Sequence, residues 1–277
     1  MKQQINKADH YLVLGNPIKH SRSPQIHAAF ARQTGEVIEY NSSLVAIDAF
    51  TRTISAMVAN GTQGFNITLP FKQQAFELAD TLSSSASLAG AVNTLSIRDN
   101  NLHGDNTDGV GLVRDLTLNH DFDFKDKDVL LLGAGGAVRG VIEPIIKQQP
   151  RSITIANRTV VRAQELVVVF SDLFSIAACA YEDLDQSYDL IINGTSASLE
   201  GQQLPVPDIT VNTNSYLYDM MYSATPTVFN QWGSSLGAKQ TLDGLGMLVE
   251  QAAEAFFIWR SVRPQTQSVI CDLRRNL

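Results

Sequence analysis

The chain has 277 residues, a formal net charge of −7, 44% hydrophobic residues and 18% charged residues. This length suits one or two domains, and the composition excludes a disordered, collagen-like or coiled-coil chain. The acidic balance offers no basic surface for nucleic acid, and no basic amphipathic stretch suggests a membrane surface, so we expect neither partner.

The first hundred residues alternate between strand and helix patterns. A short apolar run at residues 11–14 ends at Gly15, and Pro24 then opens a helix that reaches Gln33. Asp99 and Asn100 lie between two short apolar segments and predict a hairpin. This part is therefore expected to be α/β. The remaining predicted elements are strands at 37–45, 65–68, 92–97 and 101–104, and helices at 48–59 and after Pro70.

The middle of the chain begins a new unit at a charged turn, residues 125–128. Residues 129–132 form a continuous apolar run, as a parallel strand buried on both faces requires. The elements that follow are spaced like βαβ units and predict a doubly wound sheet. They are helices at 138–148 and 160–170 and strands at 152–156 and 190–193; a helix at 109–119 connects the two parts, and a long helix at 245–260 comes last.

Cysteine and histidine usage gives no sign of a structural metal or a disulfide framework. Cys179 and Cys271 lie far apart, and the five histidines lack ligand-type spacing, so we expect no metal. The N-terminal residues lack the apolar region of a signal peptide, and no run of about 18 apolar residues exists to span a bilayer. We therefore predict a cytoplasmic protein.

A glycine-rich loop follows the buried strand directly and opens a helix. Such a loop lets the backbone approach a pyrophosphate, and the helix N-terminus supplies free amides and a favourable dipole. Val138 takes the place where this fingerprint has glycine or alanine. The alternative is that the glycines only make a tight turn. The loop residues are Gly133, Ala134, Gly135, Gly136 and Ala137.

The residues after the next strand bear on the choice of cofactor. An NAD site would ordinarily place an acid here, but the chain has Asn157, Arg158 and Thr159, with Arg162 one turn later. Two guanidinium groups can bind a ribose 2′-phosphate, so the segment favours NADP over NAD. The alternative is a solvated basic helix face.

Three further segments carry candidate catalytic or binding side chains. The hydroxyls of Ser21 and Ser23 precede a helix and can donate to a carboxylate, although serine before proline is also an ordinary helix cap. Lys72 lies in the first turn of a helix, a poor position for helix stability, and Asp108 lies at a strand-to-helix junction. The alternatives are that Lys72 is a solvated lysine at a helix start and that Asp108 is a helix N-cap.

With these residues in view, the chain resembles the shikimate dehydrogenase family from about Leu12 to Trp259. Eight motifs occur in the family order. They lie at residues 15–24, 65–72, 89–94, 104–109, 133–137, 157–159, 218–222 and 243–251.

The resemblance implies a role for each matching residue. Lys72 and Asp108 are similar to the family's catalytic pair, and both would also touch substrate. Lysine can act as general acid toward a ketone oxygen that gains negative charge. The other implied substrate residues are Ser21, Ser23, Asn66, Thr68, Asn93, Tyr222 and Gln251. The implied cofactor residues are the five of the glycine loop, Asn157, Arg158, Thr159, Arg162, Thr195, Ser196, Met220, Gly244 and Met247.

The resemblance also implies a fold and an activity. The fold would be α/β with two domains: an N-terminal α/β substrate domain, residues 1–108, completed by C-terminal helices 245–277 that pack back on it, and a Rossmann-like doubly wound NADP domain, residues 109–244. The activity would be the reversible NADPH-dependent reduction of 3-dehydroshikimate to shikimate, in aromatic amino acid biosynthesis, by a monomer or homodimer.

Two alternative functions remain open. A quinate/shikimate dehydrogenase would be expected to favour NAD, with an acid near Arg158, and the Asn157–Thr159 segment argues against it. A non-catalytic NADP-binding regulator on the same fold would need neither Lys72 nor Asp108. Two residues also depart from the family pattern: Gly194, where alanine is more common, and Val138, where serine or another small residue is common.

Overall fold

The computed structural model describes residues 8–277, which divide into two compact units. The first unit contains residues 8–107 and Val249–Cys271, and the second contains Asp108–Leu248 and Asp272–Leu277. These limits differ from the predicted ones at two places: Asp108, predicted as the end of the first domain, belongs to the second unit, and at the C-terminal end residues 245–248 and 272–277 also belong to the second unit. Local contacts explain the C-terminal difference: Gly246 packs against Asp115, and Arg274 forms an ion pair with Asp243.

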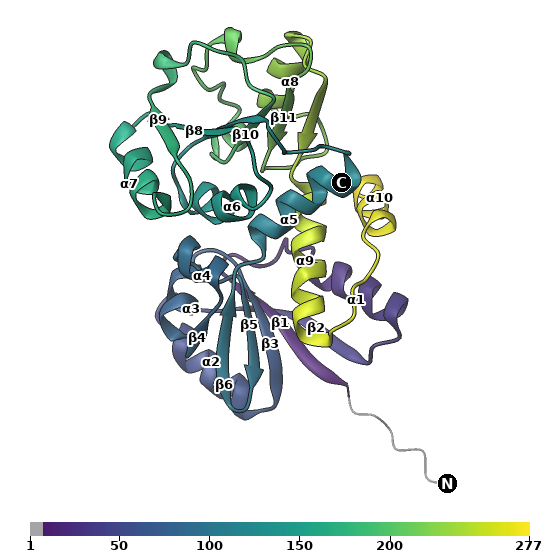
Figure 1. Ribbon diagram of the computed structural model, residues 1–277. Coiled ribbons are helices and arrows are strands. Elements are labelled where there is room, and N and C mark those ends of the chain that lie inside the picture. The colour runs from purple at the N-terminus through teal and green to yellow at the C-terminus, as the bar shows by residue number, and fades with distance from the viewer. Residues whose placement is uncertain (1–7) are drawn as a thin grey trace. The chain divides into compact units, whose positions relative to one another are not determined.

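The first unit is built on a six-stranded mixed sheet in the order β2-β1-β3-β5-β6-β4 (Figure 1). Strand β1 is parallel to β2 and β3, β5 is antiparallel to β3 and β6, and β4 is parallel to β6. The elements are β1 (Asp9–Gly15), α1 (Ser23–Thr34), β2 (Ile38–Leu44), α2 (Phe50–Ala59), β3 (Thr62–Ile67), α3 (Lys72–Leu78), β4 (Thr81–Leu82), α4 (Ser84–Ala89), β5 (Thr94–Arg98) and β6 (Asn101–Asp105).

The predicted hairpin of this unit is confirmed by β5 and β6. Asp99 and Asn100 connect these strands with φ angles of 51° and 62°. Two successive left-handed residues match the right-handed twist of a hairpin, and asparagine and aspartate tolerate that conformation best after glycine.

The long C-terminal helix α9 (Leu245–Arg260) packs on the first unit from Val249 onward. Trp259 stacks on Tyr11 of β1 with ring centroids 4.6 Å apart, and Arg260 forms ion pairs with Asp9 and Glu36. A Cβ at Gly64 would lie 2.5 Å from the Trp259 indole nitrogen, so glycine makes this close approach possible. The predicted return of C-terminal helical structure to the first unit is confirmed. The last helix is α10 (Gln267–Arg275).

The second unit contains a six-stranded parallel sheet in the order β12-β11-β10-β7-β8-β9 (Figure 1). Counted within the unit, the order is 6-5-4-1-2-3, the dinucleotide-binding arrangement, so the predicted doubly wound sheet is confirmed. The strands are β7 (Asp128–Leu132), β8 (Ser152–Ala156), β9 (Ile176–Cys179), β10 (Leu190–Asn193), β11 (Tyr216–Asp219) and β12 (Gln240–Asp243). The helices are α5 (Asp108–Arg114), η1 (Asp115–Asn119), α6 (Gly136–Ile146), α7 (Val160–Phe170), η2 (Tyr181–Asp183), η3 (Ala197–Glu200), η4 (Asp208–Thr210) and α8 (Val228–Ser235).

The predicted helix at 109–119 is present but changes form along its length. It is α-helical in α5 and becomes a π-helix in η1. Asp115, the first residue of η1, is 1% exposed and accepts a hydrogen bond of 2.7 Å from the Tyr218 hydroxyl. This buried pair joins η1 to β11.

Candidate functional site

In the first unit, most of the predicted substrate residues lie at one edge of the sheet. Parallel strands β1 and β3 end there, and antiparallel β5 begins there, since Asn66 near the end of β3 is opposite Thr94 at the start of β5. The loop after β1 carries Ser21, and Thr68 follows β3. Strand polarity therefore gathers residues from distant segments at the same edge.

The two serines stand at the start of α1. Ser21 is half-buried, and its Oγ accepts a hydrogen bond of 3.3 Å from the Ser23 backbone amide, so it caps one amide of the first turn. Ser23 is 8% exposed. The alternative that Ser23, the serine before proline, caps the helix is not confirmed, because Ser23 is the first helical residue and Arg22 stands at the cap position without a side-chain hydrogen bond. The hydrogen bond accepted by Ser21 leaves the Ser21 hydroxyl proton available for another acceptor.

Asn93 lies at the centre of a buried hydrogen-bond network. Its Oδ1 accepts from the Thr94 hydroxyl and from the Thr107 amide, both at 2.9 Å. Its Nδ2 donates to Thr107 Oγ1 at 2.9 Å and to Gln251 Oε1 at 3.3 Å. Two predicted substrate residues, Asn93 and Gln251, are therefore hydrogen-bonded to each other although they are 158 positions apart.

Lys72 is the first residue of α3, and its side chain is half-buried. Its carbonyl accepts a hydrogen bond of 2.9 Å from the Val92 amide, which ties the start of α3 to the segment that carries Asn93. Thr68 lies just before this helix, and its amide donates to Leu14 O at 2.9 Å. Two backbone hydrogen bonds thus hold the predicted lysine in the same part of the unit as Asn93.

Asp108 and Tyr222, two predicted substrate residues, belong to the second unit. Asp108 is the first residue of α5, where a carboxylate is favourable for the helix dipole, and it is half-exposed. Tyr222 follows β11 and is also half-exposed.

In the second unit, every predicted cofactor segment follows the carboxyl end of a strand. The glycine loop follows β7, Asn157–Thr159 follows β8, Thr195 and Ser196 follow β10, Met220 follows β11, and Gly244 follows β12. Because all of these strands are parallel, the five segments share one edge of the sheet. This edge includes the point between β7 and β10 where the strand order reverses, which is where nucleotides bind in such sheets.

The glycine loop has room for a phosphate group. Gly133 has a φ of 104°, a conformation that requires glycine. A Cβ at Gly135 or Gly136 would meet no atom within 4 Å, so packing within the protein does not demand these two glycines. The open space lies before the first turn of α6, where unpaired amides favour an anion. The residues therefore fit a dinucleotide pyrophosphate.

The two departures from the family pattern are neighbours in space. A Cβ added at Gly194 would lie 2.4 Å from Val138 Cγ2 and 3.2 Å from Met220 Sδ. The larger side chain at 138 thus occupies the room that alanine would need at 194. Gly194 and Val138 are matched to each other, and both are accommodated without disturbing the strands.

The basic segment after β8 is exposed. Arg158, Thr159 and Arg162 are exposed, and Asn157 Nδ2 donates to Thr159 O at 2.8 Å. Burial raises the pKa of Tyr181, and the nearby Arg158 charge counters part of that rise. Arg158 therefore lies near Tyr181 and remains accessible to an anionic ligand.

The remaining cofactor candidates line the ends of β10 to β12. Asn193 Oδ1 accepts from the Thr195 amide at 3.0 Å and from its hydroxyl at 2.8 Å, which holds this loop; Ser196 beside it is exposed. A Cβ at Gly244 would lie 2.2 Å from Met220 O, so glycine lets the ends of β11 and β12 approach. Met247 is 9% exposed.

Thr94 and Thr107 both hydrogen-bond to Asn93; they lie inside the motifs 89–94 and 104–109, but the motifs gave them no role. Tyr40, whose hydroxyl donates to Asn66 Oδ1, and His27, whose ring stacks on Tyr40, lie outside every motif. A single buried polar residue in a strand or helix carries no periodic signal. Asp115 was missed for the same reason.

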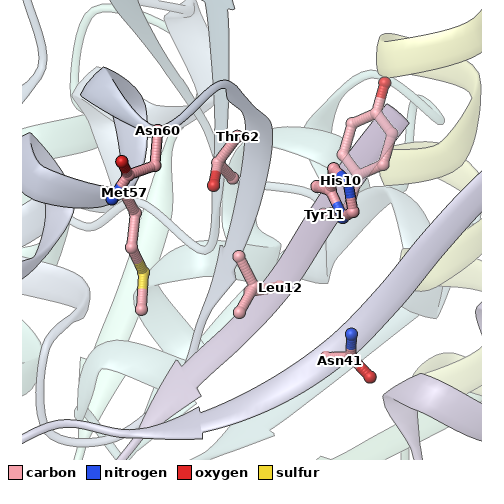
Figure 2. A pocket seen from close by; sticks show the side chains of 7 residues that line it. All are labelled: His10, Tyr11, Leu12, Asn41, Met57, Asn60 and Thr62. Carbon is pink, nitrogen blue, oxygen red and sulfur yellow. The ribbon is translucent and has the colours of Figure 1, made fainter. Parts of the chain in front are cut away.

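The first unit contains a pocket of about 290 Å³; its lining side chains are shown in Figure 2. None of its lining residues was predicted to bind substrate or cofactor. They come from β1, β2, β3 and the end of α2 and are His10, Tyr11, Leu12, Asn41, Met57, Asn60 and Thr62.

No helix within residues 8–277 combines the length and apolar character needed to cross a bilayer. The same residues contain no group of three or more His, Cys, Asp or Glu side chains arranged to hold a metal ion.

The sheet order, the glycine loop and the basic segment define a dinucleotide-binding α/β protein with a second α/β unit. Family models match in three segments: a shikimate dehydrogenase substrate binding domain at residues 13–95, a shikimate / quinate 5-dehydrogenase domain at 116–200, and a shikimate 5′-dehydrogenase C-terminal domain at 244–270.

Relatives match over nearly the whole chain. A shikimate dehydrogenase (NADP(+)) of Cellvibrio japonicus is 51% identical, covering 97% of this chain and 98% of the relative. An Ael1 enzyme from Pseudomonas putida has a solved structure with a TM-score of 0.93 and 41% identity, covering 96% of this chain and 98% of that one. A shikimate 5-dehydrogenase from Thermus thermophilus, solved with NADP(H) and shikimate, has a TM-score of 0.87 and 30% identity, covering 97% of this chain and 100% of that one. The chain belongs to the shikimate dehydrogenase family.

Proposed function

We infer that this protein is an NADP-dependent shikimate dehydrogenase, which reversibly reduces 3-dehydroshikimate to shikimate in aromatic amino acid biosynthesis. The observation that carries this conclusion is about 50% identity, over nearly the full length, to relatives named shikimate dehydrogenase (NADP(+)). A family member solved with NADP(H) and shikimate supports it.

We propose that the first unit binds substrate and the second binds NADP. The gathering of Ser21, Ser23, Asn66, Thr68 and Asn93 at one sheet edge supports the first assignment. The open glycine loop and the basic segment at the edge of the parallel sheet support the second.

In the proposed reaction, bound NADPH supplies the hydride that reduces the ketone carbon. The Lys72 ammonium donates a proton to the ketone oxygen as negative charge develops there, and it takes the proton back in the reverse direction. Asp108 accepts a hydrogen bond from a ring hydroxyl. Both are group types suited to moving or holding a proton without help from a metal ion.

The substrate carboxylate and hydroxyls need neutral donors and acceptors. The Ser21 and Ser23 hydroxyls donate to the carboxylate. The amides and hydroxyls that hold the ring belong to Asn66, Thr68, Asn93, Tyr222 and Gln251.

Cofactor binding depends on two chemical features. Amides of the glycine loop donate to the pyrophosphate, and the Arg158 and Arg162 guanidinium groups pair with the 2′-phosphate. The Thr195 loop, Met220, Gly244 and Met247 border the nicotinamide half.

We also propose that the enzyme works in the cytoplasm, as a monomer or homodimer. Cys179 and Cys271 are both free, which suits a reducing compartment. Light scattering of the purified protein measures the oligomeric state.

The test is to mix purified protein with shikimate and NADP⁺ and to record the absorbance of the reduced nicotinamide. We expect turnover with this pair and much slower turnover with quinate or NAD⁺. Faster turnover of quinate with NAD⁺ supports the quinate/shikimate dehydrogenase instead. Binding of NADP⁺ without turnover of either substrate supports a regulator.

A further inference from the structure

A chain of hydrogen-bonded side chains runs through the interior of the first unit and connects three predicted substrate residues, Asn66, Asn93 and Gln251. Tyr40, Thr94 and Thr107 also belong to this network. Thr94 and Thr107 lie inside two of the motifs but were given no role, and Tyr40 lies outside every motif.

The orientation of the Asn66 amide follows from its partners. Its Nδ2 donates to Asn93 O at 3.4 Å and to Thr94 Oγ1 at 3.1 Å. A backbone carbonyl can only accept, so the amide nitrogen must face Asn93 and the Asn66 oxygen must face Tyr40. The Tyr40 hydroxyl therefore donates its proton to Asn66 Oδ1, at 2.7 Å.

Burial raises the pKa of Tyr40 well above its ordinary value, so the phenol keeps its proton and can donate it to Asn66.

The Tyr40 ring is held in place by His27. The two rings stack with centroids 4.0 Å apart and planes 8° from parallel. His27 is fully buried, and neither ring nitrogen has a hydrogen-bond partner among the described residues. Burial lowers the pKa of His27 to about 3, although the neighbouring Asn66 side chain opposes part of that shift. The imidazole is therefore neutral and serves as a flat surface for the phenol.

We propose that Tyr40, held against His27, is a positioning residue that orients the Asn66 amide for the substrate ring. This inference rests on the proposed function. The Tyr40 hydroxyl fixes the Asn66 oxygen, and Asn93 O and Thr94 Oγ1 fix its nitrogen, so the amide is set in one orientation before substrate binds.

The test is Tyr40→Phe, which removes one oxygen and keeps the stacked ring. We expect the KM for shikimate to rise about tenfold, the scale of one lost hydrogen bond that also leaves Asn66 Oδ1 without a donor. The KM for NADP⁺ and kcat should stay within about twofold, because only substrate binding is affected. An unchanged KM for shikimate, or equal effects on shikimate and NADP⁺, overturns the inference.

Tyr11→Phe is the matched control. Tyr11 is 3% exposed in the same sheet, and its hydroxyl contacts Arg260 at 3.3 Å, so the change is chemically identical but outside the network. Its KM for shikimate should equal that of the wild type. A tenfold rise there as well assigns the effect to general disturbance of the sheet and overturns the inference.

A double-mutant cycle with Asn66→Ala tests whether Tyr40 acts through Asn66. If it does, Tyr40→Phe should raise the KM for shikimate much less in the Asn66→Ala background than in the wild type. Full additivity of the two changes overturns the inference. Wild-type turnover of shikimate is measured first: its absence refutes the proposed function, whereas active wild type with an unaffected Tyr40→Phe variant refutes only this inference.

Discussion

Lys72 is the residue proposed to donate the proton to the ketone oxygen. The lysine begins α3, where its positive charge is unfavourable for the helix dipole, so helix stability does not account for a lysine at this position. We predict that Lys72→Ala lowers kcat by about 10²–10⁴-fold, the usual contribution of a general acid. The measurement is steady-state turnover of shikimate with NADP⁺.

Lys147→Ala is the control for this change. Lys147 is 65% exposed and pairs with Glu143 four residues earlier, away from the predicted site residues in sequence. Its kcat should match the wild type. A loss of less than tenfold for Lys72→Ala, with unchanged KM, removes Lys72 from the proton-transfer role.

Arg158 determines the choice between the two cofactors. Its guanidinium is exposed after β8, ready to pair with a 2′-phosphate that NADH lacks. We predict that Arg158→Ala raises the KM for NADPH roughly ten- to a hundredfold, the scale of lost charged hydrogen bonds, and leaves the KM for NADH nearly unchanged. Initial rates with each cofactor measure this.

Arg151→Ala provides the comparison, because Arg151 precedes β8 at its opposite end and pairs with Asp128. The Arg151→Ala change should leave the KM for NADPH and the KM for NADH unchanged. Equal effects of Arg158→Ala on the two cofactors refute the assignment.

At the scale of elements, the turn after β10 packs closely against helix α6, where Gly194 leaves room for the Val138 side chain. The steric contact between position 194 and Val138 predicts that Gly194→Ala alone destabilises the protein by about 1–3 kcal/mol through overpacking. In a Val138→Ser background the same change should cost much less, because the clashing methyl group is gone. Urea denaturation of the four proteins in this cycle measures the coupling; equal costs in both backgrounds contradict a direct contact.

Elements with a clear apolar pattern between turn residues were predictable, and others were not. Strands β8 and β10 and helices α7 and α9 have the predicted bounds, because each joins a continuous or periodic apolar pattern to clear turn residues. Strands β4, β9, β11 and β12, of two to four residues, were not predicted. Pairing with a neighbouring strand makes these short segments strands.

For the whole molecule, the lowered pKa of His27 makes stability depend on pH. Its pKa is about 3 in the folded protein against an ordinary value of 6.5. Below about pH 6.5 the His27 side chain therefore binds a proton in the unfolded chain but not in the folded chain. The free energy of unfolding falls for this reason as the pH drops from about 6.5 toward 3. Through His27, the free energy of unfolding falls by about 2 kcal/mol from pH 6.5 to pH 5.

His27→Phe keeps a stacked ring and removes the titrating group. We expect urea denaturation at the two pH values to give a smaller loss of stability for this variant, by about 2 kcal/mol. His20→Phe, a change at an exposed histidine, should keep the wild-type dependence. An identical pH dependence for wild type and His27→Phe contradicts the prediction.

The sequence by itself determined which chemical groups follow which strands: the glycine loop after β7, the guanidinium groups after β8, and the serines before α1. These follow from local order along the chain, since a loop's residues are known once the strand before it is. Only the tertiary structure decided that Tyr40 would donate to Asn66, that the neutral His27 ring would stack on Tyr40, and that Gly194 would match Val138. Each of these depends on contacts between residues distant in sequence, and pairing and packing, rather than any local pattern, bring them together.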